Sequence, residues 1–291
     1  MIMEEQKNSF STRQNIVYAV EDGIELMGDL YIPNGIGPFP VIVALPGGGW
    51  FFSDKLALRL WGGFFAQNGI ALFAASYRVS SRQKGFPKPI CDALSAIQFI
   101  RFSSKTLNID PERIALLGPS AGAHVAALAA LAGDSPLFAD RHPVAVPAST
   151  STKVLAFAGI YGVYDLFALW QQEISEACEA HMRHTEVFMG ASPYANRQLY
   201  FDASPVSYVN NANKKLPIFL AYGTADKVVQ PAMQSEVFAK LLKQAGFRVR
   251  EYQFSDAGHF WFSEETIGDL HNNVTRLAPD LLRFMEKILL P

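Results

Sequence analysis

The chain has 291 residues, a length that α/β folds often fill as one domain, and we expect a single domain over residues 1–291. Apolar residues make up 49% of the chain and charged residues 18%, a composition that suits a large buried sheet. The formal net charge of −2 gives no reason to expect nucleic acid or an anionic membrane surface as a partner.

Eight segments show the alternation or the apolar runs of β-strands. The first two, residues 15–20 and 25–32, flank Glu21-Asp22-Gly23 and predict an antiparallel hairpin at a sheet edge. Six further strands are expected over residues 41–45, 70–76, 114–117, 154–160, 218–222 and 249–254. Helical patterns lie between them at about 55–68, 88–107, 121–132, 231–245 and 275–289. The alternation indicates an α/β fold with a mainly parallel sheet flanked by helices.

Two segments interrupt this alternation. Residues 133–153 are rich in Pro, Ala, Ser and Thr without a period, which predicts a long surface loop, mobile in part. Residues 161–216 form an insertion with several aromatic side chains among polar ones. We expect the insertion to be a small cap, and its aromatic residues suit either a pocket lid or ordinary packing against the main body.

A G-x-S-x-G pattern with Ser120 at its centre lies between the strand at 114–117 and the helix at 121–132. This context predicts a tight strand–turn–helix in which a strained serine projects its hydroxyl above the sheet edge. Gly118 and Gly122 lack Cβ atoms, so strand and helix can approach closely on either side of it. Ser120 is therefore the candidate nucleophile, and it needs a base and an orienting acid.

Both partners follow later strands, in loops that meet at the carboxyl edge of a parallel sheet. Asp226 follows the strand at 218–222, and His259 follows the strand at 249–254. As alternatives, Asp226 could cap the next helix and His259 could be an ordinary loop histidine. Asp256 is the rival acid, although its place three residues before His259 favours a role in shaping that turn. His124 lies one helical turn beyond Ser120 and is interpreted as structural.

Acyl transfer also needs donors for a developing oxyanion. The glycine run after the strand at 41–45 lets backbone N–H groups face a cavity, and Gly48 and Gly49 are expected to act with the N–H of Ala121. A plain flexible turn is the alternative, while a phosphate-binding loop is disfavoured because no Lys follows the glycines closely. Aromatic residues beside these loops are expected to form walls of the substrate site: Trp50, Phe51, Phe52, Phe260 and Trp261.

Metal and disulfide chemistry are not expected. Cys178, His181, His184 and Glu186 resemble a ligand spacing only superficially, and a solvated helix face explains them better. The other cysteine, Cys91, falls inside a helical apolar pattern and reads as a small core residue. We therefore predict a protein that needs no cofactor.

The N-terminus has no positively charged leader before an apolar stretch, and no apolar run approaches the length of a membrane span. These features favour a cytoplasmic protein without membrane insertion. The sequence does not define the oligomeric state, and a homodimer stays an open alternative.

The motifs together resemble the α/β-hydrolase esterases, and within them the acetyl esterase/lipase group, in particular its feruloyl and acetyl-xylan esterase-like branch. The resemblance covers roughly residues 15 to 290 and rests on Pro46–Trp50, Ser76–Arg78, 109–114, Gly118–Gly122, Gly223–Asp226 and Gly258–His259. It implies an eight-stranded α/β-hydrolase fold, with Ser120 as nucleophile, His259 as base and acid, and Asp226 as orienting acid. Pro46 stands where that group usually has His, a change that leaves the backbone donors in place.

The predicted function is therefore hydrolysis of short-chain acyl or acetyl esters of small molecules by a serine carboxylesterase through an acyl-enzyme. Two alternatives stay open. The same side chains could hydrolyse an aryl formamide, and the fold can also serve a non-catalytic ligand-binding protein.

Overall fold

The structure, a computed structural model, describes residues 9–80, 84–141, 143–176 and 183–290. Eight strands form one sheet in the order β1-β2-β4-β3-β5-β6-β7-β8, in which β1 and β2 are antiparallel and the other six run parallel. The strands are β1 (Phe10–Glu21), β2 (Ile24–Pro33), β3 (Phe39–Ala44), β4 (Ala71–Ala75), β5 (Ile109–Pro119), β6 (Phe157–Ile160), β7 (Ile218–Gly223) and β8 (Val249–Phe254). The predicted hairpin and mainly parallel sheet are confirmed.

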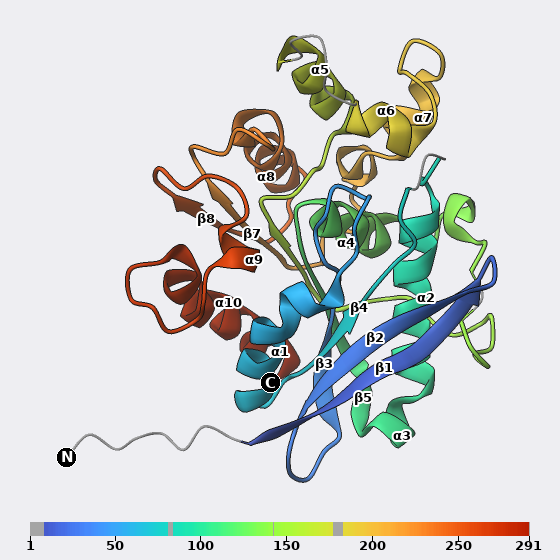
Figure 1. Cartoon of the computed structure of the whole chain (residues 1–291), viewed down its shortest axis with the longest axis vertical. Coiled ribbons are helices and arrows are strands. Elements are labelled where there is room, and N and C mark those ends of the chain that lie inside the picture. The colour runs from blue at the N-terminus through green and yellow to red at the C-terminus, as the bar shows by residue number, and fades with distance from the viewer. Residues whose placement is uncertain (1–8, 81–83, 142, 177–182, 291) are drawn as a thin grey trace.

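Helices cover both faces of this sheet (Figure 1). On one face lie α1 (Arg59–Gln67), the short α9 (Trp261–Glu264) and α10 (Asn273–Leu289), which pack in one apolar cluster. On the other face lie α2 (Lys88–Phe102), α4 (Ala121–Ala132) and α8 (Ser235–Gln244), which form a second cluster. The sheet therefore separates two hydrophobic cores, because its parallel strands are apolar on both sides.

The predicted helices are present, with local departures at their ends. The pattern over 55–68 begins with the 3₁₀ turn η1 (Lys55–Leu58), and that over 88–107 divides at Ser103 into α2 and α3 (Ser104–Leu107). The pattern over 231–245 likewise begins with a 3₁₀ turn, η4 (Pro231–Met233), which precedes α8.

The described residues between 133 and 153 are irregular, as predicted, apart from the turn η2 (Pro136–Phe138). The segment nevertheless packs against α2. Gln98 and Arg101 of that helix donate hydrogen bonds to the carbonyls of Thr150 and Ser151, and Phe138 is fully buried. This contact explains why α2 is buried around nearly its whole circumference instead of on one face.

The insertion at 161–216, called the cap from here on, lies above the carboxyl ends of the strands at the top of Figure 1. Its described part contains α5 (Leu166–Glu176), α6 (His184–Met189), α7 (Arg197–Asp202) and the turn η3 (Pro205–Tyr208). Five large aromatic side chains in the described part of the cap are buried: Tyr161, Tyr164, Trp170, Phe188 and Tyr200. Packing against the main body therefore accounts for much of its aromatic content.

Candidate active site

The turn between β5 and α4 holds Ser120 in a strained conformation, with φ 53° and ψ −125°. The backbone around it is too close for larger residues. A Cβ atom on Gly118 would lie 2.4 Å from the carbonyl carbon of Gly122, and one on Gly122 would lie 2.1 Å from the carbonyl oxygen of Leu45. The predicted close approach of strand and helix is confirmed, and it raises the serine above the sheet edge.

The structure brings Ser120, His259 and Asp226 together. His259 Nε2 lies 3.0 Å from Ser120 Oγ, and His259 Nδ1 lies 2.6 Å from Asp226 Oδ2. An ionised carboxylate can only accept, so Nδ1 carries the proton and Nε2 is left to accept from the serine hydroxyl. The side chains of His259 and Asp226 are 2% and 1% exposed, so water does not compete for these bonds.

Asp226 does not cap the next helix, since Gln230 and Gln234 occupy the cap positions of η4 and α8. It instead holds the backbone of its own loop and contacts the histidine. Its Oδ1 atom accepts hydrogen bonds of 2.9 Å from the N–H groups of both Val228 and Val229, while Oδ2 contacts His259. Asp256, the rival acid, instead shapes the turn before His259. Its own backbone N–H donates to Thr224 Oγ1, and its φ of 59° reverses the chain there. The contact through which Asp256 shapes this turn therefore comes from its backbone.

The glycine loop after β3 presents backbone donors to the same place. Gly48 and Gly49 have φ values of 131° and 60°, which favour glycine. Within the part of the chain that the structure describes, their N–H groups and that of Ala121 form no hydrogen bond to protein. The loop is fixed at its start, where the Tyr77 hydroxyl donates to the Pro46 carbonyl over 2.8 Å. Pro46 thus contributes a backbone acceptor at the position where a histidine side chain is usual.

The end of the glycine loop is fixed by a buried histidine. Trp50 Nε1 donates to His124 Nδ1 over 3.1 Å, so His124 Nε2 carries the proton and donates to the Ala203 carbonyl of the cap over 2.8 Å. The Trp50 ring also stacks on Phe188 of α6, with centroids 4.5 Å apart. Burial lowers the pKa of His124 to about 4, which keeps the imidazole neutral. His124 therefore joins the nucleophile helix, the glycine loop and the cap.

Ser120 opens into a cavity of about 700 Å³, which the three glycines, His259 and residues of the cap also line. Of the predicted aromatic walls, Phe51 and the half-exposed Phe260 line the cavity, and so does Trp50, although it is only 2% exposed. Trp261 does not. The left-handed backbone of Phe260 starts α9 and turns Trp261 into the core, where it packs on Tyr161 and Phe254. The prediction of a substrate-binding role for Trp261 is thus wrong.

Phe52, 74% exposed, also lines the cavity, as predicted from its place after the glycine run. Tyr161 was not predicted from the sequence. Its ring lies beside that of His259, with 4.4 Å between the ring centroids. Tyr161 directly follows β6, so the same strand-end argument that identified Asp226 could have found it.

One wall of the cavity belongs to the cap. It is formed by Leu169, Gln172 and Glu173 of α5 and His184 of α6. The pKa of Glu173 is raised by burial. His184 is exposed, as expected for a solvated helix face. Its ring also packs edge-on against that of Phe51, with 5.3 Å between the ring centroids.

Among the described residues, no cluster of His, Cys, Asp and Glu has the arrangement of a metal site. Cys178 and His181, two members of the superficially metal-like spacing, lie outside the described residues. Glu186, a third member, instead accepts a hydrogen bond of 2.7 Å from Trp170 Nε1 and pairs with Arg183.

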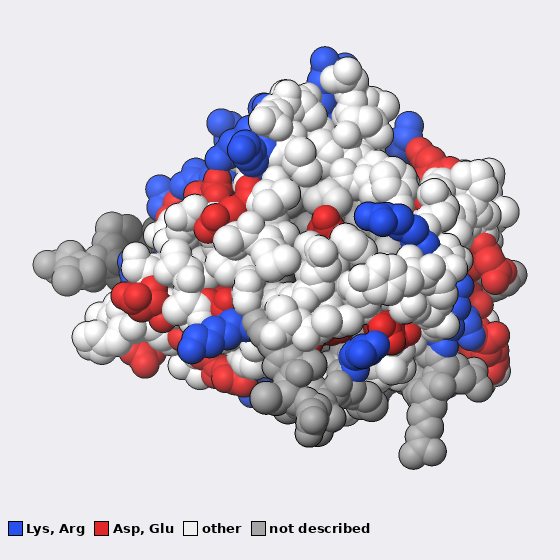
Figure 2. Space-filling model, turned by 90° about the horizontal axis from the view of Figure 1, so that it is seen from above, with Lys and Arg blue, Asp and Glu red and all other residues white. Residues whose placement is uncertain are grey.

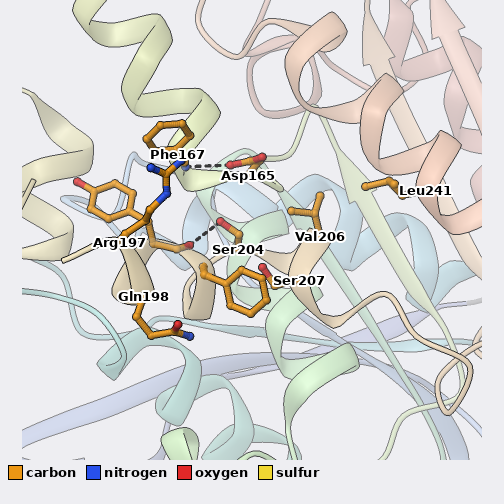
Figure 3. A pocket seen from close by; sticks show the side chains of 10 residues that line it. Asp165, Phe167, Arg197, Gln198, Ser204, Val206, Ser207 and Leu241 are labelled. Carbon is orange, nitrogen blue, oxygen red and sulfur yellow. Dashed lines mark hydrogen bonds between the residues drawn. The ribbon is translucent and has the colours of Figure 1, made fainter. Parts of the chain in front are cut away.

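A second cavity, of about 510 Å³, lies between the cap and α8 (Figure 3). Arg197 packs over the ring of Phe167 there, at 5.0 Å from its centroid, and Asp165 caps α5. This cavity shares no lining residue with the one at Ser120. Its polar side chains serve local structure, and Ser120, His259 and Asp226 lie elsewhere, so we place the candidate site at the cavity that Ser120 lines.

The face of the molecule that carries the cap is mainly neutral. Figure 2 shows this face, on which uncharged side chains cover most of the centre and Lys, Arg, Asp and Glu are interspersed around them. No helix within the described ranges is long and apolar enough to cross a membrane.

The eight-stranded sheet, the strained serine turn and the adjoining histidine and carboxylate define an α/β-hydrolase fold. Residues 28–242 match the family model BD-FAE, and the chain belongs to that family.

Curated relatives match this chain over about half of their own length. This chain is 33% identical over 230 residues to esterase LipQ of Mycobacterium tuberculosis, and the match covers 77% of this chain and 50% of the relative. This chain is also 28% identical over 261 residues to the probable isoprenylcysteine alpha-carbonyl methylesterase ICMEL1 of Arabidopsis thaliana. That match covers 85% of this chain and 50% of the relative. Among solved structures, native Est2 esterase of Thermogutta terrifontis matches with a TM-score of 0.73 and 24% identity, covering 98% of this chain and 94% of that one. This likeness supports the fold.

Proposed function

We propose that the chain is a serine carboxylesterase that hydrolyses short-chain acyl or acetyl esters of small molecules. The observation that carries this proposal is the hydrogen-bonded series Ser120–His259–Asp226, with its 3.0 Å and 2.6 Å contacts, at the floor of the 700 Å³ cavity. The names of the curated relatives, which are esterases and carboxylic ester hydrolases, support the same class of reaction.

The geometry suits a two-step reaction. Ser120 Oγ attacks the ester carbonyl while His259 Nε2 takes the hydroxyl proton. The imidazolium, paired with Asp226, then gives that proton to the departing alkoxide, and the acyl group stays on the serine as an ester. Water enters in place of the alcohol, loses a proton to His259 and releases the carboxylic acid, which returns the serine to its starting state.

The developing negative charge on the substrate oxygen needs preset donors. In the proposal these are the N–H groups of Gly48, Gly49 and Ala121, which bond to no acceptor among the described residues and which belong to the lining of the cavity beside Ser120. Donors that are already oriented need no reorganisation during the reaction, and one such donor typically contributes about 10²–10³ in rate.

Short acyl groups are favoured because nearly buried aromatic side chains, Trp50 and Tyr161, stand on the cavity wall and cannot swing out of the way. A series of p-nitrophenyl esters of increasing acyl length tests this preference. Fastest turnover of acetyl to butyryl esters is expected, and fastest turnover of long-chain esters would reject it. Comparison with an N-formyl aromatic amide distinguishes the esterase from a formamidase, which would show the higher kcat/KM on the amide.

A fluorophosphonate probe tests the nucleophile. The wild-type protein is expected to be labelled, and Ser120→Ala is expected to lose both labelling and activity while its thermal stability stays close to that of the wild type. Absence of labelling in folded wild-type protein would instead indicate a non-catalytic ligand-binding protein.

The identity of the acid is tested by a pair of variants. Asp226→Asn is expected to lower kcat by about 10⁴, as in the trypsin-like precedent. Asp256→Asn is the matched control, since the Asp256 contact to Thr224 uses only its backbone. A larger loss in Asp256→Asn would show that the acid is assigned to the wrong residue.

A further inference from the structure

The side chain of Gln172 connects the cap to the loop that carries Asp226. Gln172 lies on α5 and is 3% exposed. Its Nε2 atom donates to the carbonyls of Lys227 and Val228 over 3.0 and 3.3 Å, and its Oε1 atom accepts from the N–H of Gln230 over 3.2 Å. One buried amide thus bonds to three backbone groups of the loop that carries Asp226.

The two carbonyls belong to the peptide groups that hold the carboxylate. The Lys227 carbonyl shares its peptide group with the N–H of Val228, and the Val228 carbonyl shares its peptide group with the N–H of Val229. Both N–H groups donate to Asp226 Oδ1, each over 2.9 Å. Two parallel series of hydrogen bonds therefore run from the Gln172 amide, through one peptide group each, to the same carboxylate oxygen.

Such series strengthen each bond, because a carbonyl that accepts a hydrogen bond polarises its own peptide N–H. They also fix the direction in which each N–H points. With Oδ1 held from behind in this way, Oδ2 is left at 2.6 Å from His259 Nδ1. Gln172 of the cap is therefore connected to Asp226 through these two peptide groups.

On this basis we propose that Gln172 is a positioning residue for the reaction: it acts through the peptide groups of the acid loop on Asp226 and so on His259. The inference rests on the proposed function, in which Asp226 orients the catalytic histidine.

The test uses a shape-matched substitution, Gln172→Met, which keeps the side-chain length but cannot form the three hydrogen bonds. A matched control exists in Gln234, which is also a buried glutamine, 1% exposed, with three hydrogen bonds. Its Oε1 accepts from the N–H groups of Tyr164 and Asp165, and its Nε2 donates to the Asp165 carbonyl. None of these groups contacts Asp226, so Gln234→Met removes comparable bonds from the cap alone.

Three measurements are made on the full chain: the melting temperature, kcat and KM for p-nitrophenyl acetate. Both variants are expected to melt below the wild type. Gln172→Met is expected to lower kcat by about tenfold, with KM changed less than kcat, while Gln234→Met keeps kcat within about twofold. Equal losses of kcat in the two variants would overturn the inference.

A double mutant supplies the decisive comparison. In an Asp226→Asn background, Gln172→Met is expected to change kcat by less than about twofold, because the group through which Gln172 acts is already impaired. A tenfold loss in both backgrounds would show that Gln172 acts independently of Asp226 and would overturn the inference, although the proposed function would stand. If Asp226→Asn alone kept wild-type activity, the proposed function and the inference would fail together, so the two failures are distinguishable.

Discussion

Replacement of His124 by glutamine is expected to remove a pH dependence from the stability of the protein. The imidazole is fully buried, and its two ring nitrogens are committed to Trp50 and to the Ala203 carbonyl. Protonation of Nδ1 would abolish the acceptor that Trp50 needs and would place an unpaired charge in the core. His124 is therefore harder to protonate in the folded protein than in the unfolded chain.

The magnitude follows from the pKa. Burial lowers the pKa of His124 from 6.5 to about 4. At about 1.4 kcal/mol per pKa unit, this difference corresponds to about 3 kcal/mol. A lowered histidine pKa means that the unfolded state binds the proton first as the pH falls. The contribution is thus fully present above pH 6.5, is lost progressively between pH 6.5 and about pH 4, and then levels off.

The assay is urea unfolding followed by far-ultraviolet circular dichroism at several pH values from 7.5 to 4 in steps of about half a unit, chosen to span the window that linkage defines. Other groups titrate in this range, including Asp92, whose pKa burial raises to about 6. They are common to both proteins, so the difference between wild type and His124→Gln isolates the histidine.

The free energy of unfolding of the wild type is expected to fall by about 3 kcal/mol more than that of His124→Gln across this window. Glutamine is suitable because its amide can accept from Trp50 and donate to the cap in any protonation state of its neighbours. The exposed His271, changed to glutamine, is the control and should leave the wild-type pH dependence in place. Parallel curves for wild type and His124→Gln would refute the reasoning.

Three further substitutions test individual contacts. Gly122→Ala places a Cβ atom 2.1 Å from the Leu45 carbonyl and is expected to cost about 1–3 kcal/mol or more in urea unfolding; unchanged stability would contradict the close approach. Tyr77→Phe removes the donor that fixes the start of the glycine loop, so kcat should fall more than KM rises, with a stability loss of about 1 kcal/mol. Phe260→Ala should alter KM for the ester, whereas Trp261→Ala should chiefly lower the melting temperature, since only Phe260 lines the cavity. If Trp261→Ala instead altered KM and Phe260→Ala only lowered the melting temperature, Trp261 would line the substrate site as predicted from the sequence.

The sheet and the approximate placement of the candidate site were predictable because they follow from one rule of topology. Parallel strands all end at the same edge, so side chains just beyond β5, β7 and β8 converge however far apart they are in the sequence. The contacts of His259 with Ser120 and Asp226 agree with this prediction. The rule does not depend on details of packing, which explains why strand ends were informative.

Features that depend on a single backbone rotation or on the placement of the cap were not predictable. Phe260 adopts a φ of 65°, and this one angle directs Trp261 into the core. The Gln172 contact joins residues more than fifty positions apart, and no periodicity or composition marks it. The walls of the cavity are likewise set by tertiary packing of α5 and α6 against the loops, for which a single sequence offers no pattern.

The attachment of the cap at two opposite sides of the site has a consequence for engineering. A chimera that exchanges the cap for that of another hydrolase would keep the serine, histidine and aspartate unchanged in sequence. It would nevertheless lose the Gln172 amide behind the acid loop, and the Phe188 ring and Ala203 carbonyl that support Trp50. In the proposed mechanism, substrate scope and catalytic competence therefore depend on the same contacts: a transplanted cap has to supply an amide beside the acid loop, a stacking ring and a carbonyl acceptor of its own.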